Sequence, residues 1–447
     1  MAKIILKSDQ NKRYKLPGLQ PLYLKNKLIP DLIFFLVLVA LPSSFFALIP
    51  DSVFFDLRLV FFLVSSLYII FYFKNIKKIT RLPGGKAFIL LNIFLLWQIG
   101  YSLFVKSIPF IEVATIFRTN FFYPLSAFGF LLYVTDMGND RIYRFMNWVL
   151  FISFIQGVLY IISNVLGFNI FAFGVQEYDY EGANILQNMS AIPHYNGVLF
   201  TFAFAAALFY KKFNKHWLWF VPLGVTIISI VRSQMVVYLL IIILILGLAK
   251  VSKTRFSFSK MFKIAFLIIF FIGLLLFVFP SHVGGVINRF GLDNKEKITR
   301  SKYLEEGTYY LRLELIRDAY NRTKKNNNLL LGNGYIRESE KGDPDFVIGG
   351  DTLIAPVIYT EGFVGIVFRI LPIFLLMLYY IKLLFSKNKK FKVFATVSIA
   401  LVLPEIVNAV QTKFFVHYTR EVFILFVLAF VIHNFNKINN KRKFYVA

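Results

Sequence analysis

Long apolar runs recur along almost the whole chain, and they restrict the fold more than any other feature. Residues 264–279, IAFLIIFFIGLLLFVF, contain no charged side chain. A helix crosses a hydrocarbon core about 30 Å thick with about 20 apolar residues, and it satisfies its own backbone hydrogen bonds there. Of the 447 residues, 57% are hydrophobic and 17% are charged. The sequence therefore predicts an all-α polytopic membrane protein.

We predict about twelve transmembrane helices, which would place both ends of the chain on one side of the membrane. The first 28 residues show no removable signal peptide, so the first span is expected to direct insertion. The predicted organisation is nine spans within 1–280, a large loop at 281–350, and a re-entrant segment with three more spans at 351–447. The expected spans are about 31–49, 54–73, 87–105, 120–135, 145–167, 194–210, 217–231, 234–249, 262–280, 361–384, 393–411 and 421–435.

Lysine and arginine are concentrated in alternate connections between these spans. The seven segments on the side of the termini hold 31 of the 50 basic residues, whereas the short loops opposite hold six. The positive-inside rule makes the basic side, with both termini, cytoplasmic. The large loop 281–350 faces outward with 12 basic and 10 acidic residues, and loops this long are exempt from the rule. The formal charge of +26 thus fits a membrane surface, and we expect no nucleic-acid partner.

Several classes of chemistry lack the residues that they need. The chain has no cysteine, which excludes disulfides, thiolate metal sites and thiol nucleophiles. It also has no HExxH, P-loop or GxSxG motif. We therefore expect neither a metal nor a cofactor.

The stretch GGDTLIAPVIYTEGFVGIVF at 349–368 holds residues that a simple span does not need. We expect 349–360 to be a surface or re-entrant segment bent near Pro356. The two glycines that follow it are expected to share a helical face and to admit a close neighbour. The unusual residues are Asp351, Thr352, Glu361, Gly362 and Gly365.

An amphipathic helix is predicted at 303–322 within the large loop. A rotation of about 100° per residue places Arg312 in the middle of the apolar face, which also carries Tyr320, and places Arg317 on the polar face. Arg312 either lays its stem along apolar surface with its charge in water or directs its guanidinium at a phosphate. Arg317 is expected to be solvated.

Two further outward arginines lie beside predicted spans. Arg232 occupies a very short turn between two long apolar runs, and Arg118 precedes the fourth span. Each alone can be an interfacial anchor. Together with Arg312 they would form an anion site at the lipid headgroup boundary, which suits a lipid-linked pyrophosphate.

Ionisable residues inside spans are costly and usually face a polar interior. Glu405 in the eleventh span is expected either to pair with an arginine or to take part in chemistry. Arg369 in the tenth span is expected to be its partner or to snorkel. His194, at the start of the sixth span, is expected to be a structural group rather than a base.

These residues give the chain a resemblance to the O-antigen polymerase and ligase superfamily, which comprises Wzy-type repeat-unit polymerases and lipid A-core ligases. The family has an outward arginine before a long apolar span, as at Arg232. Its large loop has an arginine-led helix and a Gly-x-Gly turn, matched by Arg312, Gly332 and Gly334, although Ile316 stands where tryptophan is frequent.

A polar pair and a following Glu-Gly complete the resemblance. The pair is Asp351–Thr352, and Glu361, Gly362 and Gly365 follow at the family's spacing. A fainter match is PHYNG at 193–197. The ligases carry a histidine where Asp351 stands, so this residue favours a polymerase.

The resemblance implies a GT-C-like fold and a metal-independent glycosyltransferase of the bacterial inner membrane. It would join undecaprenyl-pyrophosphate-linked oligosaccharides, as donor and acceptor, beside membrane lipid; a chain-length regulator and a flippase are further implied partners. Arg232 and Arg312 would stabilise the leaving pyrophosphate, and Asp351, or else Glu361, would accept the acceptor's proton. The implied substrate-binding residues are Arg118, Arg317, His194, Asn196, Thr352 and Tyr320.

Three alternatives stay open from the sequence. A ligase would use the same chemistry with another acceptor, and a flippase or exporter of lipid-linked oligosaccharide would also have about twelve spans. Transporters often have repeated halves, and no internal repeat is visible here. A membrane scaffold without enzymatic activity is the third alternative.

Overall fold

The structure is a computed structural model. In it the chain divides into two compact units. They comprise residues 1–61 with 137–293, and residues 62–136 with 294–447. The residues that the structure describes are 57–117, 121–166, 177–180, 183–186, 191–209, 217–228, 232–253, 266, 270, 273, 309–336, 354–407 and 420–444.

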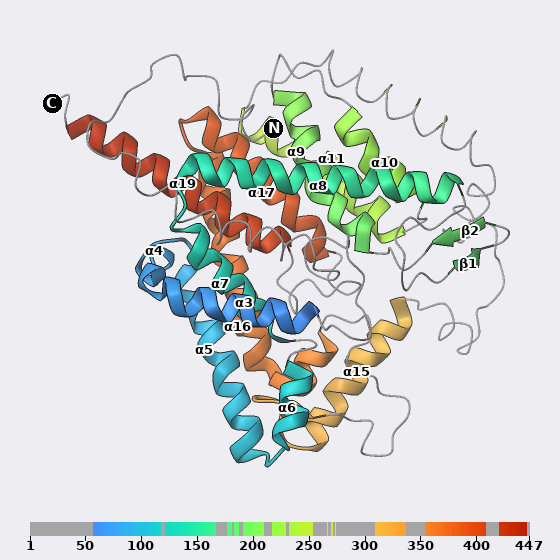
Figure 1. Cartoon of the computed structure of the whole chain (residues 1–447), viewed down its shortest axis with the longest axis vertical. Coiled ribbons are helices and arrows are strands. Elements are labelled where there is room, and N and C mark those ends of the chain that lie inside the picture. The colour runs from blue at the N-terminus through green and yellow to red at the C-terminus, as the bar shows by residue number, and fades with distance from the viewer. Residues whose placement is uncertain are drawn as a thin grey trace. The chain divides into compact units, whose positions relative to one another are not determined.

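The first unit is a group of apolar helices with one small hairpin (Figure 1). The long helix α8 packs against α9 and α10, and α9 also packs against α11. Phe200 of α9 stacks on Tyr238 of α11 with ring centroids 4.6 Å apart. The elements are α8 (Asn139–Leu166), α9 (Ala191–Phe209), α10 (Trp217–Ile228), α11 (Arg232–Val251), β1 (Glu177–Tyr180) and β2 (Ala183–Leu186).

The hairpin is the one departure from the predicted all-α class among the described residues. Its two strands are antiparallel, with Glu177 opposite Leu186 and Tyr180 opposite Ala183. Tyrosine and isoleucine favour strands, but the acidic residues between them obscured that signal in the sequence.

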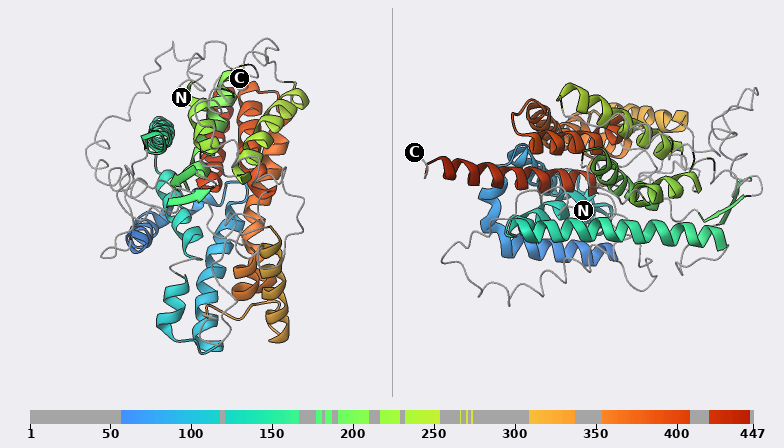
Figure 2. Two further views of the ribbon diagram at one scale, coloured as in Figure 1. Left: turned by 90° about the vertical axis from the view of Figure 1, so that its right-hand side faces the viewer. Right: turned by 90° about the horizontal axis from the view of Figure 1, so that it is seen from above.

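The second unit contains the helices that form the candidate site (Figure 2). Helix α16 packs against α5, α15, α17 and α19, and α7 packs against α5 and α19. Every residue of α7 is buried. The elements are α3 (Leu57–Tyr72, mostly in this unit), η1 (Phe73–Asn75), α4 (Ile76–Ile79), α5 (Gly85–Gly100), the π-helical turn η2 (Tyr101–Val105), α6 (Phe110–Ile116), α7 (Tyr123–Val134), α15 (Tyr309–Lys325), α16 (Ala355–Leu384), α17 (Lys389–Val407) and α19 (Arg420–Phe444).

Aromatic side chains join the helices of the second unit. Phe94 of α5 stacks on Phe368 of α16 at 4.9 Å between ring centroids, and Phe88 stacks on Phe426 of α19 at 4.7 Å. Offset stacking of this kind adds about 0.5–1.5 kcal/mol to the area that the rings bury. These contacts fix α5 beside α16, on which the site depends.

Ten of the twelve predicted spans coincide with a described helix. Within the described part of the chain, three helices are long and apolar enough to cross a membrane, namely Gly85–Val105, Asn139–Ser163 and Ala355–Leu384. The predicted span 31–49 lies outside the described residues, and so does nearly all of 262–280. The count of twelve and the sidedness stay predictions.

The amphipathic helix predicted in the large loop is confirmed as α15. Ala319 is fully buried against Ala355 and Tyr359 of α16, with Leu315 and Ile316 packed beside it. On the opposite face, Arg317, Asp318 and Asn321 are exposed. The 3.6-residue period therefore identified the face that the helix presents to α16.

Helix α16 is broken at Gly362, not bent near Pro356. Gly362 has φ 65° and ψ −164°, a region that only glycine occupies readily. Pro356 lies in the first turn of the helix, where its missing N–H costs nothing. The segment 355–360 is buried rather than on the surface. The expectation that Gly362 and Gly365 share one helical face is therefore wrong, because the break separates them.

Gly362→Ala should destabilise the second unit. A Cβ at this position would lie 2.7 Å from the amide nitrogen of Gly332, and the backbone conformation would be strained as well. We expect a loss of about 1–3 kcal/mol, measured as a lower thermal midpoint of the protein in detergent. Gly100→Ala is the control, since Gly100 is helical and a Cβ there would meet nothing within 4 Å. An equal loss in both variants would contradict this explanation.

Candidate functional site

The candidate site lies where the large loop meets the break in α16. After α15 ends, the chain runs through NLLLGNGYI to Ile336. We call residues 328–336 the plug segment. It contains the predicted Gly-x-Gly turn, and α16 contains the predicted Glu-Gly. The two motifs are thus parts of one structural unit.

The plug segment replaces hydrogen bonds that the broken helix has lost. In an unbroken helix the amides of Phe363 and Val364 would bond to the carbonyls of Tyr359 and Thr360. Here all four groups bond to the plug segment instead. The bonds join Asn333 N to Tyr359 O (2.8 Å), Gly334 N to Thr360 O (3.0 Å), Phe363 N to Leu329 O (2.9 Å) and Val364 N to Leu330 O (3.1 Å).

Glycines make this close approach possible. Gly332 and Gly334 have φ of 75° and 84°, which other residues rarely adopt. A Cβ on Gly332 would lie 2.5 Å from the amide nitrogen of Glu361, and one on Gly334 would lie 3.0 Å from Oγ of Ser102. The GNG sequence is therefore required both by backbone conformation and by space.

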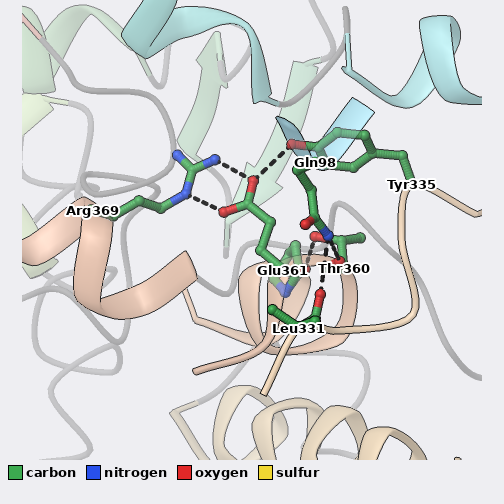
Figure 3. Close-up of polar contacts among 7 residues, drawn as sticks. Gln98, Leu331, Tyr335, Thr360, Glu361 and Arg369 are labelled. Carbon is green, nitrogen blue, oxygen red and sulfur yellow. Dashed lines mark hydrogen bonds and ion pairs between the residues drawn. The ribbon is translucent and has the colours of Figure 1, made fainter. Parts of the chain in front are cut away.

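Helix α5 also holds the plug segment, through Gln98 (Figure 3). The amide of Gln98 donates to the carbonyls of Leu331 (3.0 Å) and Thr360 (2.6 Å). Ser102 accepts a hydrogen bond from the amide of Tyr335 at 3.0 Å. A single buried amide side chain thus bridges the plug segment and the first part of α16.

A buried ion pair occupies the centre of the site (Figure 3). Both oxygens of Glu361 accept from Arg369, with Nε to Oε2 at 2.8 Å and Nη2 to Oε1 at 2.6 Å. The exposed fraction of the two side chains is 0% and 1%. The hydroxyl of Tyr335 donates to Oε1 of Glu361 at 3.0 Å. The carboxylate therefore has a bidentate arginine and a phenol as partners.

Two further residues complete the surroundings of this pair. Gly365 leaves space for the carboxylate, because a Cβ there would lie 2.8 Å from Oε2 of Glu361. Phe121 lies against the guanidinium of Arg369, 5.4 Å from its ring centroid, an arrangement that favours a cation. Burial raises the pKa of the Tyr335 phenol well above 10.0, and the Glu361 charge raises it further. Tyr335 is therefore a neutral donor at physiological pH.

Asparagines and a lysine surround the outer part of the plug segment. Lys106 donates to Oδ1 of Asn328 at 2.9 Å and lies 5.6 Å from the ring centroid of Tyr101. The amides of Asn326 and Asn328 both donate to Oδ1 of Asn333. This network joins the end of α15 to the end of η2.

The structure brings only part of the predicted site together. Glu361 is central, Tyr320 lies edge to face with Phe363 at 6.3 Å between centroids, and Arg317 is exposed. Arg118, Asp351 and Thr352 lie outside the described residues. For Arg232 and Arg312, and for His194 and Asn196 in the first turns of α9, the structure describes the backbone but not the side chain. The proposed convergence of the arginines stays a prediction.

Two expectations about charged residues change. Arg369 does not snorkel, since it is fully buried and pairs with Glu361. The side chain of Glu405, the partner that the sequence suggested, lies outside the described residues. Glu361 has both oxygens occupied, so holding an arginine describes it better than accepting a proton. Asp351 remains the candidate base.

Sequence reasoning missed Gln98, Ser102 and Tyr335 as members of the site. The signal for Gln98 was present, since a glutamine within the run LLNIFLLWQIGY needs a polar partner. Tyr335 directly follows the Gly-x-Gly turn but is one of 24 tyrosines, so nothing in the sequence distinguished it. Among the described residues, no three histidine, aspartate or glutamate side chains are grouped to hold a metal ion.

Comparison with known proteins adds no relative. No protein-family model matches the chain, and a search of curated proteins finds no match. The family resemblance therefore rests on the motifs described above.

Gln98→Met should weaken the attachment of the plug segment. The substitution keeps the volume but removes both hydrogen bonds, which leaves buried carbonyls with fewer donors. We expect a loss of about 1–3 kcal/mol, measured by thermal unfolding in detergent. Ser66→Ala is the control, because its hydroxyl bonds only within its own helix, to Phe62. No difference between the two variants would show that Gln98 does not hold the segment.

Proposed function

We propose that the chain is a membrane-embedded glycosyltransferase that polymerises polysaccharide repeat units. It would act at the outer face of the bacterial inner membrane, with both termini cytoplasmic. Donor and acceptor would be oligosaccharides linked to undecaprenyl pyrophosphate. The enzyme would need no divalent metal, because its own arginines would stabilise the leaving group.

One observation carries this proposal. The Gly-x-Gly of the large loop and the Glu-Gly of the tenth predicted span are more than 25 residues apart in the sequence. Gly334 of the first nevertheless bonds to Thr360, the residue directly before the second, and Gly332 packs against the backbone of Glu361. A chance resemblance would give no reason for the two motifs to meet. Their union supports the interpretation that they belong to one functional unit, as the resemblance implies.

The proposed reaction is a substitution at the anomeric carbon of the donor. The acceptor hydroxyl oxygen forms the new glycosidic bond, and the bond from that carbon to the pyrophosphate oxygen breaks with its electron pair. Asp351 accepts the hydroxyl proton, a contribution of about 10²–10⁴-fold. Arg232 and Arg312 stabilise the charge that develops on the pyrophosphate.

The backbone of α15 gives Arg312 a suitable position for this role. Arg312 lies in the first turn of α15, about 10 Å before Ala319 along the helix. The same helical face carries Ala319, which packs on α16. Arg232 begins α11, and three residues separate it from the end of α10, as the predicted tight turn requires.

A flippase or exporter is the second candidate, and one observation favours it. Broken helices with buried charges are frequent in transporters, where the break forms a binding site. In α16, however, the groups at the break bond to the plug segment, which leaves those groups occupied. A ligase differs from the polymerase only in its acceptor, and a single transfer instead of a ladder of products would identify it.

Reconstitution with a pyrophosphate-linked oligosaccharide should give chain growth that persists in EDTA. The double variant Arg232→Ala, Arg312→Ala should lower the rate of chain growth by at least about 10²-fold. Each arginine would stabilise the charge on the leaving group, and removal of one such donor lowers the rate by about 10²–10³-fold. Product ladders on gels measure both effects.

Lys324→Ala is the matched control, because it removes an exposed cation from the same helix α15. It should leave growth unchanged. Complete loss of growth in EDTA would refute the metal-free mechanism. Full growth in the double arginine variant would remove the proposed roles of those residues. Movement of lipid-linked sugar without any polymer would favour the flippase.

A further inference from the structure

We propose that Glu361, Arg369 and Tyr335 are positioning residues that hold the plug segment in the break of α16. They would not react with substrate themselves. Through the plug segment they would fix α15, with Arg312, and the start of α16, which follows Asp351. The step from this role to catalysis rests on the proposed function; the role in holding the plug segment does not.

The ion pair connects the two halves of the broken helix. Residues eight apart in an unbroken helix are separated by about 12 Å along its axis, which is too far for a bidentate contact at 2.6–2.8 Å. Glu361 is the last residue before the break, and Arg369 lies two turns into the second half. The contact between them therefore depends on the broken geometry of α16.

Tyr335 connects the plug segment to the same pair. Its hydroxyl bonds to Oε1 of Glu361, the oxygen that Nη2 of Arg369 also contacts. Its amide bonds to Ser102, and the neighbouring Gly334 bonds to Thr360. The carboxylate of Glu361 thus connects three segments of backbone: the plug segment through Tyr335, the first half of α16 through Glu361 itself, and the second half through Arg369.

Stability alone does not explain a buried ion pair at this place. Apolar residues of similar volume are often as stable or more stable. An ion pair, unlike apolar contacts, demands one arrangement of its partners, and hydrogen bonds to charge are directional. We therefore assign the three residues a role in fixing the position of the plug segment.

Backbone hydrogen exchange tests this role directly. The protected amides include Asn333 and Gly334 in the plug segment and Phe363 and Val364 after the break. In lipid nanodiscs, peptides covering 328–336 and 359–366 should exchange at least about tenfold faster in Tyr335→Phe, in Glu361→Gln and in Arg369→Met. A peptide from α17 serves as the internal control and should change by less than about twofold.

The double variant Glu361→Gln, Arg369→Met separates a specific pair from independent effects. If the residues act as one unit, its exchange should be no faster than that of the faster single variant, rather than the product of the two increases. Multiplied increases, an unchanged plug segment, or equal acceleration in α17 would each overturn the proposal.

Kinetics of polymer growth provide the second readout. Tyr335→Phe should lower kcat by about tenfold or more, while KM for the lipid-linked donor changes by less than about threefold, because misplaced groups act on the transition state. A change in KM alone would contradict a positioning role. If the unaltered protein makes no polymer, the proposed function fails, whereas the exchange measurements still decide whether the three residues hold the plug segment.

Discussion

The second unit depends on one requirement, that each backbone N–H and C=O at the break in α16 must have a partner. In hydrocarbon each unsatisfied group costs several kcal/mol, so irregular backbone persists only where protein surrounds it. The plug segment supplies the missing donors and acceptors, and Gln98 supplies one more donor. Helix, loop and turn are therefore interdependent, and none of them would be stable in this form without the others.

Glycines and charges have complementary roles at this place. Gly332, Gly334 and Gly362 provide backbone conformations and clearance that side chains would prevent. The ion pair of Glu361 with Arg369 then selects one arrangement among those that the glycines permit. Its net contribution to stability is expected to be small, since desolvation offsets most of the attraction. Its contribution to specificity is the larger one.

Much of this fold was predictable from the sequence, and the reasons differ by element. Apolar runs located ten helices, and the period of α15 identified its buried face through Ala319, because both signals are local. The break at Gly362 was not predicted as a break, since its cause is a segment more than 25 residues earlier in the chain. Tyr335 was missed for the same reason. No motif marks the pairing of Arg369 with Glu361, so only the structure could show it.

The packing of Ile336 against Ala355 has a consequence for how this protein can vary. Ile336 and Ala355 belong to one packed cluster, so the connection between them begins and ends at the same fixed base. The entropic cost in free energy of closing such a loop grows only slowly, by about 0.6 kcal/mol for each doubling of its length. Insertions and deletions between these two residues, outside the proposed catalytic Asp351, should therefore leave the packed cluster intact.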